Sequence, residues 1–180
     1  MRVIAGSARG RQLKTPKGTS VRPTSDKVRG AIFSILLSQR DLADAAVLDL
    51  FAGTGALGIE ALSRGASRAV FVEKDSRTAD LIRENVELCG LTDASRIVRA
   101  DAERLDLATL GTFDLVFADP PYALVLESTA LGSLAVTVGE GGIAMIEHGI
   151  DAPPPVPQGL EAFDAREYGD TGLTFYRRRP

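Results

Sequence analysis

A glycine-rich segment at residues 49–58, DLFAGTGALG, has a composition that could do chemistry. Its glycines let the backbone approach a ligand closely, and the first amides of the following helix are free to donate hydrogen bonds. The pattern Gly53-x-Gly55-x-x-Gly58, with Glu73 about 20 residues further on, fits a dinucleotide-binding fingerprint. Taken alone, the segment predicts a nucleotide-type ligand.

Acidic residues lie in or after the predicted strands that follow. Glu73 ends the second strand, where a carboxylate can accept hydrogen bonds from two ribose hydroxyls. Asp101 ends the third strand, in Ala100-Asp101-Ala102, and is placed to accept a hydrogen of an adenine amino group. Asp49, inside the first strand, either holds the glycine loop by hydrogen bonds or contacts an amino group of the ligand. These two interpretations of Asp49 stay open.

The tetrapeptide Asp119-Pro120-Pro121-Tyr122, at the end of the fourth predicted strand, is the most specific motif in the chain. Together with the glycine loop, Glu73 and Asp101, it resembles the motifs of S-adenosylmethionine-dependent amino-methyltransferases. The resemblance implies S-adenosylmethionine as the cofactor and no metal. It implies cofactor binding by Asp49, Phe51, Ala52, Gly53, Thr54, Gly55, Glu73, Lys74, Asp101, Ala102 and Asp119, and catalysis by Asp119, Pro120, Pro121 and Tyr122.

The chemistry of the turn agrees with this resemblance. An exocyclic amine on a base is a poor nucleophile, because its lone pair is delocalised into the ring. Asp119 and the carbonyl of Pro120 can each accept one amine hydrogen, which orients the lone pair towards the methyl carbon. The two prolines restrict the turn, and Tyr122 can stack on an extruded base. The methyl donor is already activated, so no metal ion or nucleophilic side chain is required.

Short apolar runs must position these motifs. Five of them alternate with helical stretches, and their continuous apolar character indicates strands buried on both faces of a parallel sheet. These runs are 46–51, 69–74, 96–100, 113–118 and 142–147. The runs 160–168 and 172–178 flank Gly169–Gly172 and predict a terminal antiparallel hairpin. These runs predict an α/β fold with a mostly parallel sheet that an antiparallel pair closes. The resemblance to amino-methyltransferases implies that it is a Rossmann-like class I methyltransferase fold with a seven-stranded sheet.

The net charge of −3 hides a division along the chain. Residues 1–40 hold nine basic side chains and one acidic, a net +8, whereas the other 140 residues hold 12 basic and 23 acidic, a net −11. Residues 2–5 and 10–14 predict a small β-hairpin, and Thr24 or Ser25 a helix start. We therefore divide the chain into a basic N-terminal hairpin arm, 1–23, and a methyltransferase domain, 24–180. Polyanion binding is one candidate role for the arm.

The N-terminal segment carries a second resemblance. RVIAGSARGRQLKTP at 2–16, RPTSDKVR at 22–29 and YGDT at 168–171 are similar to RsmD-type methyltransferases, which methylate guanine N2 in small-subunit ribosomal RNA. Gly30 stands where we expect glutamate, and the family's tryptophan before Arg-Gly-Arg is absent. The resemblance implies 16S ribosomal RNA, within a small-subunit particle, as the partner. It implies RNA contacts by Arg2, Arg9, Arg11, Lys14, Arg22, Lys27 and Arg29.

Other functions remain open from the residues alone. The Asp-Pro-Pro-Tyr turn would also suit N6-adenine methylation of DNA or RNA, or methylation of a glutamine amide. The glycine pattern and Glu73 would fit an NAD-dependent oxidoreductase, although no catalytic histidine or tyrosine-lysine pair accompanies them. A noncatalytic RNA-binding ribosome-assembly factor would use the basic arm alone.

The composition bears on the localisation of the protein and on its cysteine chemistry. No apolar run approaches the ~20 residues of a membrane helix, and the N-terminus lacks the apolar stretch of a signal peptide, so we expect a cytoplasmic protein without a membrane partner. Cys89 is the only cysteine, which excludes an internal disulfide and a cysteine-rich zinc site.

Overall fold

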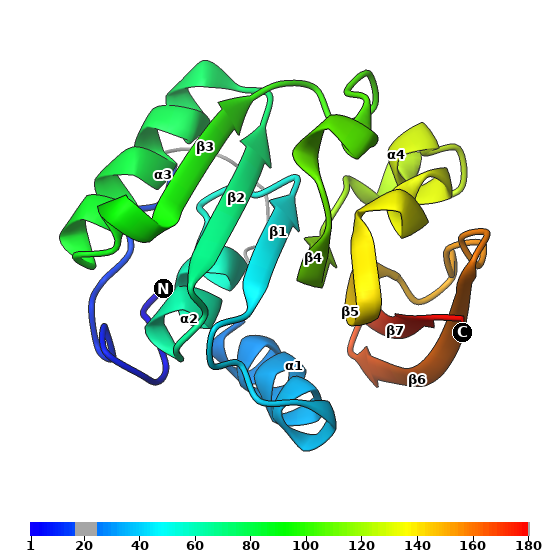
Figure 1. Ribbon diagram of the computed structural model, residues 1–180, viewed down its shortest axis with the longest axis horizontal. Coiled ribbons are helices and arrows are strands. Elements are labelled where there is room, and N and C mark those ends of the chain that lie inside the picture. The colour runs from blue at the N-terminus through cyan, green and yellow to red at the C-terminus, as the bar shows by residue number, and fades with distance from the viewer. Residues whose placement is uncertain (17–24, 180) are drawn as a thin grey trace.

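Within residues 1–16 and 25–179, which this computed structural model describes, seven strands form one sheet in the order β3-β2-β1-β4-β5-β7-β6 (Figure 1). The strands are β1 Ala46–Leu50, β2 Arg68–Glu73, β3 Ser95–Arg99, β4 Phe113–Ala118, β5 Val138–Gly149, β6 Leu160–Tyr168 and β7 Thr171–Arg178. The five strands from β3 to β5 are parallel, and β7 and β6 continue the sheet antiparallel. This architecture confirms the predicted fold class.

Helices cover both faces of the sheet. The α-helices are α1 Asp26–Gln39, α2 Ala56–Ser63, α3 Ser76–Leu88 and α4 Thr129–Gly132, and the 3₁₀ helices are η1 Thr92–Ala94, η2 Leu107–Leu110, η3 Tyr122–Leu124 and η4 Leu134–Thr137. Residues of α1, α2 and α3 pack against the strand side chains on one face of the sheet. Residues of η2, α4 and η4 pack against those on the other face. No described helix is both long and apolar enough to cross a lipid bilayer.

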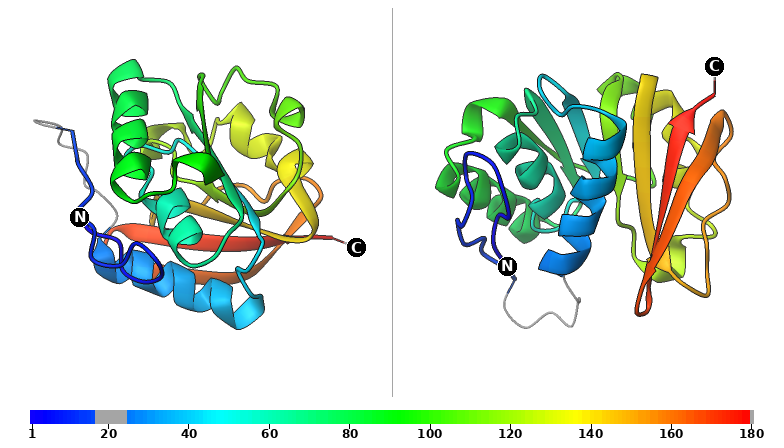
Figure 2. Two further views of the ribbon diagram at one scale, coloured as in Figure 1. Left: turned by 60° about the vertical axis from the view of Figure 1, so that its left-hand side comes forward. Right: turned by 90° about the horizontal axis from the view of Figure 1, so that it is seen from below.

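Helix α1 begins where its cap predicts. The hydroxyl of Ser25 accepts a hydrogen bond from the amide of Val28 at 3.2 Å, which satisfies one of the free donors of the first turn. Val28, Ile32 and Leu36, which recur at helical spacing, are buried together with Phe33. These side chains pack α1 against the sheet and helix α2, and Figure 2 shows the helix lying along the body of the protein.

The N-terminal segment forms less β-structure than its sequence predicts. The predicted segments 2–5 and 10–14 do pair: an antiparallel bridge joins Arg2 to Gln12, and the amides of Val3 and Gly10 donate to the carbonyl oxygens of Arg11 and Val3 at 3.0 and 2.9 Å. The pairing is too short for either segment to form a regular strand. The next two amides bond to helix α2 instead: those of Ile4 and Ala5 donate to the buried carboxylate of Glu60 at 2.7 and 3.0 Å. The segment therefore lies against helix α2 instead of forming a free hairpin (Figure 2).

Gly6 makes the closest approach between this segment and α2. Its φ is +82°, and a Cβ at this position would lie 1.7 Å from the carbonyl oxygen of Ser63. The next amide, that of Ser7, donates to the same oxygen at 2.7 Å. The segment thus satisfies a carbonyl at the C-terminal end of α2 that the helix leaves without a partner.

Gly6 and Gly10 provide a matched test of this docking. Both have a positive φ near the same value, but a Cβ on Gly10 would meet nothing within 4 Å. We expect Gly10→Ala to cost about 1 kcal/mol of unfolding free energy through backbone strain alone. Gly6→Ala should cost roughly 2 kcal/mol more, because the methyl group displaces the segment. Urea unfolding measures both, and equal losses would show that the close approach does not matter.

Candidate active site

Acidic residues singled out in the sequence meet at the carboxyl ends of adjacent strands. Asp49 lies in β1, Glu73 is the last residue of β2, and Asp119 directly follows β4. In the parallel register, Leu50 of β1 lies opposite the residues that precede Glu73 and Asp119. From β1 the chain continues to β2 and β3 on one side of the sheet, and it then crosses back to β4 on the other side of β1. The carboxyl ends of β1 and β4 therefore form the switch point, where open α/β sheets bind ligands.

The three carboxylates also share one face of the sheet. Side chains alternate along a strand, so a residue two positions after an inward residue points the same way. Asp49, Glu73 and Asp119 each follow by two positions a residue that is buried against α1, α2 and α3. Those preceding residues are Val47, Phe71 and Phe117.

Two of these carboxylates hold the glycine loop between β1 and α2. Asp49 Oδ2 accepts a hydrogen bond from the amide of Gly58 at 2.9 Å, and Glu73 Oε2 accepts one from the amide of Gly53 at 3.0 Å. Phe51 enters the loop with a φ of +59°, a conformation that is costly for a residue other than glycine. A Cβ on Gly58 would lie 2.3 Å from the ring of Phe71, so only glycine fits there.

The loop and its surroundings fit a nucleoside-type cofactor. A Cβ on Gly53 would meet only the carbonyl oxygen of Phe51, at 3.9 Å, which leaves open space for a ligand beside the loop backbone. Glu73 is partly exposed, and a carboxylate can accept more hydrogen bonds than the two from the amides of Gly53 and Asp75. Within the same region Ala52 and Gly55 are buried, Thr54 is partly exposed and Lys74 is exposed.

Burial dominates the electrostatics of Asp49. Its side chain is nearly inaccessible, and desolvation raises the pKa of its carboxyl group from 3.8 to about 7, against the lowering effect of the Gly58 amide. The negative charge of Glu73 adds to the increase. The observed contact of Asp49 is with the loop backbone, which is the structural one of its two interpretations.

Asn85 joins the N-terminal segment to the glycine loop, and sequence reasoning missed it. Its buried side-chain amide donates to the carbonyl oxygens of Thr54 and Lys14 at 3.0 and 3.1 Å, and its Oδ1 accepts from the amide of Lys14 at 2.8 Å. A polar residue at a buried position of the amphipathic helix α3 was the available signal. The N-terminal segment and the glycine loop, which are distant in sequence, are therefore both hydrogen-bonded to the side chain of Asn85.

The Asp-Pro-Pro-Tyr turn lies beside the loop. Burial, and then the charges of Glu147 and Asp49, raise the pKa of Asp119 well above its ordinary value. Pro120 is buried and Pro121 is exposed. Tyr122 begins η3 with 41% of its surface exposed, and its hydroxyl lies 3.3 Å from Glu147 Oε1. An aromatic face is thus available beside a buried carboxylate.

Asp101 lies on the other side of the glycine loop, after β3. Its Oδ1 accepts a hydrogen bond from the amide of Glu103 at 3.2 Å, and Ala102 between them is buried. Glu103 reaches the segment after the Asp-Pro-Pro-Tyr turn, where it accepts from the hydroxyl of Ser128 at 2.5 Å and the amide of Thr129 at 2.8 Å. These bonds connect the two loops that border the site.

The basic residues of the N-terminal region have different environments. Arg9, Arg11 and Lys27 are exposed, Arg2 lies 3.7 Å from Asp26, and Lys14 forms an ion pair with Glu84 at 2.8 Å. Arg22 lies outside the described residues. The exposed cations on either side of the Gly10 turn remain available to a polyanion.

Arg29 does not fit the role that the resemblance implied for it. Its side chain is fully buried, and Nη2 donates to the carbonyl oxygen of Arg2 at 2.5 Å and to Asp26 at 2.7 Å. The reason is helical geometry: position 29 lies beside Val28 and one turn before Phe33, on the face that packs inward. Arg29 holds the N-terminal segment on α1 instead of facing solvent.

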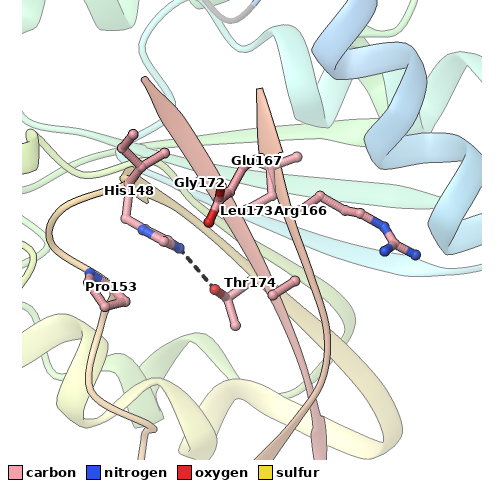
Figure 3. A pocket seen from close by; sticks show the side chains of 9 residues that line it. His148, Pro153, Arg166, Glu167, Gly172, Leu173 and Thr174 are labelled. Atoms are coloured by element: carbon pink, nitrogen blue, oxygen red, sulfur yellow. Dashed lines mark hydrogen bonds between the residues drawn. The ribbon is translucent and has the colours of Figure 1, made fainter. Parts of the chain in front are cut away.

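His148 lies on the opposite face of the sheet from the carboxylates. Its Nε2 lies 2.9 Å from the hydroxyl of Thr174, as Figure 3 shows, and its Nδ1 lies 2.8 Å from the carbonyl oxygen of Gly149. The histidine borders a hollow of about 450 Å³ between β7 and the loop that contains Pro153. Both ring nitrogens have partners, so this is a structural histidine.

The sheet order, with the site at its switch point, defines a Rossmann-like class I methyltransferase fold. A family model described as "Conserved hypothetical protein 95" matches residues 1–177. The chain belongs to this family, the RsmD-type methyltransferases.

Relatives match along the whole chain. "Putative rRNA methyltransferase YlbH" of Bacillus subtilis (strain 168) is 38% identical, over 99% of this chain and 100% of that protein. "Ribosomal RNA small subunit methyltransferase D" of Escherichia coli (strain K12) is 32% identical, over 99% and 90%. The solved structure of "Putative methyltransferase yhhF from Escherichia coli" is 30% identical and covers 99% of this chain and 97% of that one, with a TM-score of 0.83.

The raised pKa of Asp49 predicts a pH-dependent stability. Between the ordinary pKa of 3.8 and about 7, the folded protein holds a proton that the unfolded chain releases. The corresponding stabilisation is complete at low pH and is lost as the pH rises to about 7. Asp49→Asn cannot titrate, so its unfolding free energy should fall by roughly 2 kcal/mol less than that of the wild type between about pH 5 and pH 8. Urea titrations at the two pH values measure this difference, and identical losses would contradict it.

Proposed function

We propose that the protein transfers a methyl group from S-adenosylmethionine to the exocyclic N2 amine of a guanine in small-subunit (16S) ribosomal RNA. The observation that carries this proposal is the Asp-Pro-Pro-Tyr turn beside a glycine loop that two carboxylates hold at the switch point of the sheet. Membership of the RsmD-type family, through relatives named ribosomal RNA methyltransferases, supports the choice of RNA.

The cofactor would be held by the loop and the strand ends around it. In this proposal Glu73 accepts the ribose hydroxyls, Asp101 and Ala102 border the adenine, and the loop from Phe51 to Gly55 faces the rest of the molecule. When bound, S-adenosylmethionine supplies a methyl group that its sulfonium already activates. The protein therefore has to orient the two reactants and exclude water, and it does not have to supply a nucleophile of its own.

The amine would be oriented at the turn after β4. Asp119 and the carbonyl of Pro120 each accept one amine hydrogen, which aims the nitrogen lone pair at the methyl carbon. Tyr122 presents its exposed ring to the extruded base. The proton that the nitrogen must lose after transfer can pass to the ionised form of Asp119, which its raised pKa makes a stronger base than an ordinary carboxylate.

Removal of the Asp119 carboxylate tests these roles. Asp119→Ala should lower the rate of methyl transfer to ribosomal RNA at least about 100-fold, because the amine loses a preorganised acceptor. Cofactor affinity, measured by calorimetry, should stay within a few-fold of the wild type. Glu140→Ala, which removes an exposed carboxylate of β5, is the control and should not change the rate. Transfer at the normal rate by Asp119→Ala would overturn the assignment.

Arg9 and Arg11, the exposed arginines on either side of the Gly10 turn, are proposed to bind the RNA backbone. Neutralising both in Arg9→Gln with Arg11→Gln should weaken binding and flatten its salt dependence by about one counterion per lost phosphate contact. The charge-matched control, Arg166→Gln with Arg177→Gln, removes two exposed cations from β6 and β7. Filter binding over a range of salt concentrations measures the slopes. An unchanged slope for the first pair, with a flatter one for the second, would move the RNA surface to the C-terminal hairpin.

A further inference from the structure

Glu147 is a buried carboxylate beside the proposed catalytic turn. It lies near the end of β5, and only 4% of its surface is exposed. Ala118 of β4 pairs with Ile146 of β5 in parallel register. Asp119 and Glu147 each follow this pair by one residue, so they occupy equivalent positions at the ends of neighbouring strands, which lie about 4.8 Å apart in a sheet.

Both carboxylates also point to the same side. Ala118 and Ile146 pack in the cluster with η2, α4 and η4, and alternation turns the next residue of each strand to the opposite face. Asp119 and Glu147 are close enough to interact electrostatically, because the charge of Glu147 contributes to the raised pKa of Asp119. Two adjacent carboxylates offer several acceptor sites side by side, which is the arrangement that a ligand with two adjacent donors needs.

Glu147 also touches the aromatic residue of the turn. The hydroxyl of Tyr122 lies 3.3 Å from Glu147 Oε1 and 3.0 Å from the hydroxyl of Thr171, and the Tyr122 ring packs over Gly149. A base that stacks on this ring would therefore carry its polar edge into the region of Glu147 and Asp119. The side chain of Glu147 is within reach of whatever atom neighbours the reacting amine.

We propose that Glu147 selects guanine by accepting a hydrogen bond from its N1–H, while Asp119 and the carbonyl of Pro120 take the hydrogens of N2. Guanine carries N1–H and the N2 amine next to each other, whereas adenine carries an unprotonated N1 acceptor next to its amine. A buried carboxylate that faces an acceptor has no hydrogen to accept, so a base without N1–H is rejected. This inference rests on the proposed function and adds to it the residue that determines specificity.

The test uses a target base that keeps the nucleophile and lacks the neighbouring donor. 2-Aminopurine has the 2-amine of guanine, but its N1 is unprotonated and a hydrogen replaces O6. The change of preference in the Glu147 variant below, not the wild-type preference alone, therefore assigns the N1–H contact to Glu147. RNA substrates with guanine or 2-aminopurine at the target position are compared by kcat/KM for methyl transfer from labelled S-adenosylmethionine. The wild type should prefer guanine on the order of 100-fold or more, as expected for a site built around a substrate donor. Equal kcat/KM values for the two RNAs with the wild-type enzyme would overturn the inference without any variant.

Glu147→Gln then assigns the preference to this residue. The glutamine amide can accept from N1–H or donate to an unprotonated N1, so the preference for guanine should fall at least about tenfold. Tyr122→Phe is the matched control, because it removes the hydroxyl partner of Glu147 and keeps both the ring and the carboxylate. Whatever its effect on the rate, Tyr122→Phe should keep the wild-type preference. If Glu147→Gln lowers kcat/KM by the same factor on both RNAs, the preference is unchanged. This result would contradict the inference and would leave Glu147 only the role of positioning Tyr122.

Failure of the proposed function gives a different result. In that case the wild type transfers no methyl group to N2 of the guanine substrate, and product analysis by mass spectrometry shows either no product or another methylated base. Failure of the inference alone leaves N2-methylguanine as the product, with no dependence of the base preference on Glu147.

Discussion

The arrangement of the site depends on two hydrogen bonds that fix the glycine loop to its own sheet. Asp49 and Glu73 accept from the amides of Gly58 and Gly53, so the loop is shaped by carboxylates at the ends of two neighbouring strands. Asn85 adds a third connection from the N-terminal segment to the carbonyl of Thr54. The glycine loop, proposed to bind the cofactor, and the proposed RNA-binding segment are therefore held by one continuous set of polar contacts.

The same edge of the sheet gathers carboxyl groups that are shielded from water. Asp49 and Asp119 both have raised pKa values, chiefly because burial disfavours their ionised forms, and nearby carboxylates add to the effect. Such a cluster lowers the stability of the folded protein and persists where a ligand offers compensation. A cationic sulfonium and a base edge rich in donors provide that compensation in the proposed reaction.

Much of this organisation could be predicted from the sequence, for physical reasons. Strand β4 has its predicted bounds, because a parallel strand that is buried on both faces has a continuous apolar sequence. Once the strand ends are known, the positions of the acidic residues that follow them are known as well. The pairing of 2–5 with 10–14 could be predicted, but its short extent could not, since the amides of Ile4 and Ala5 bond to Glu60, a residue distant in sequence. The burial of Arg29 likewise depends on the carbonyl of Arg2, and the pairing of Glu147 with Asp119 on strand register.

The most direct test of the central claim is to identify the product. Small ribosomal subunits from cells that lack the gene are incubated with the purified protein and isotopically labelled S-adenosylmethionine, and the RNA is then digested for nucleoside mass spectrometry. The account predicts labelled N2-methylguanosine as the product. Label in any other nucleoside, or no label in the RNA, would contradict it.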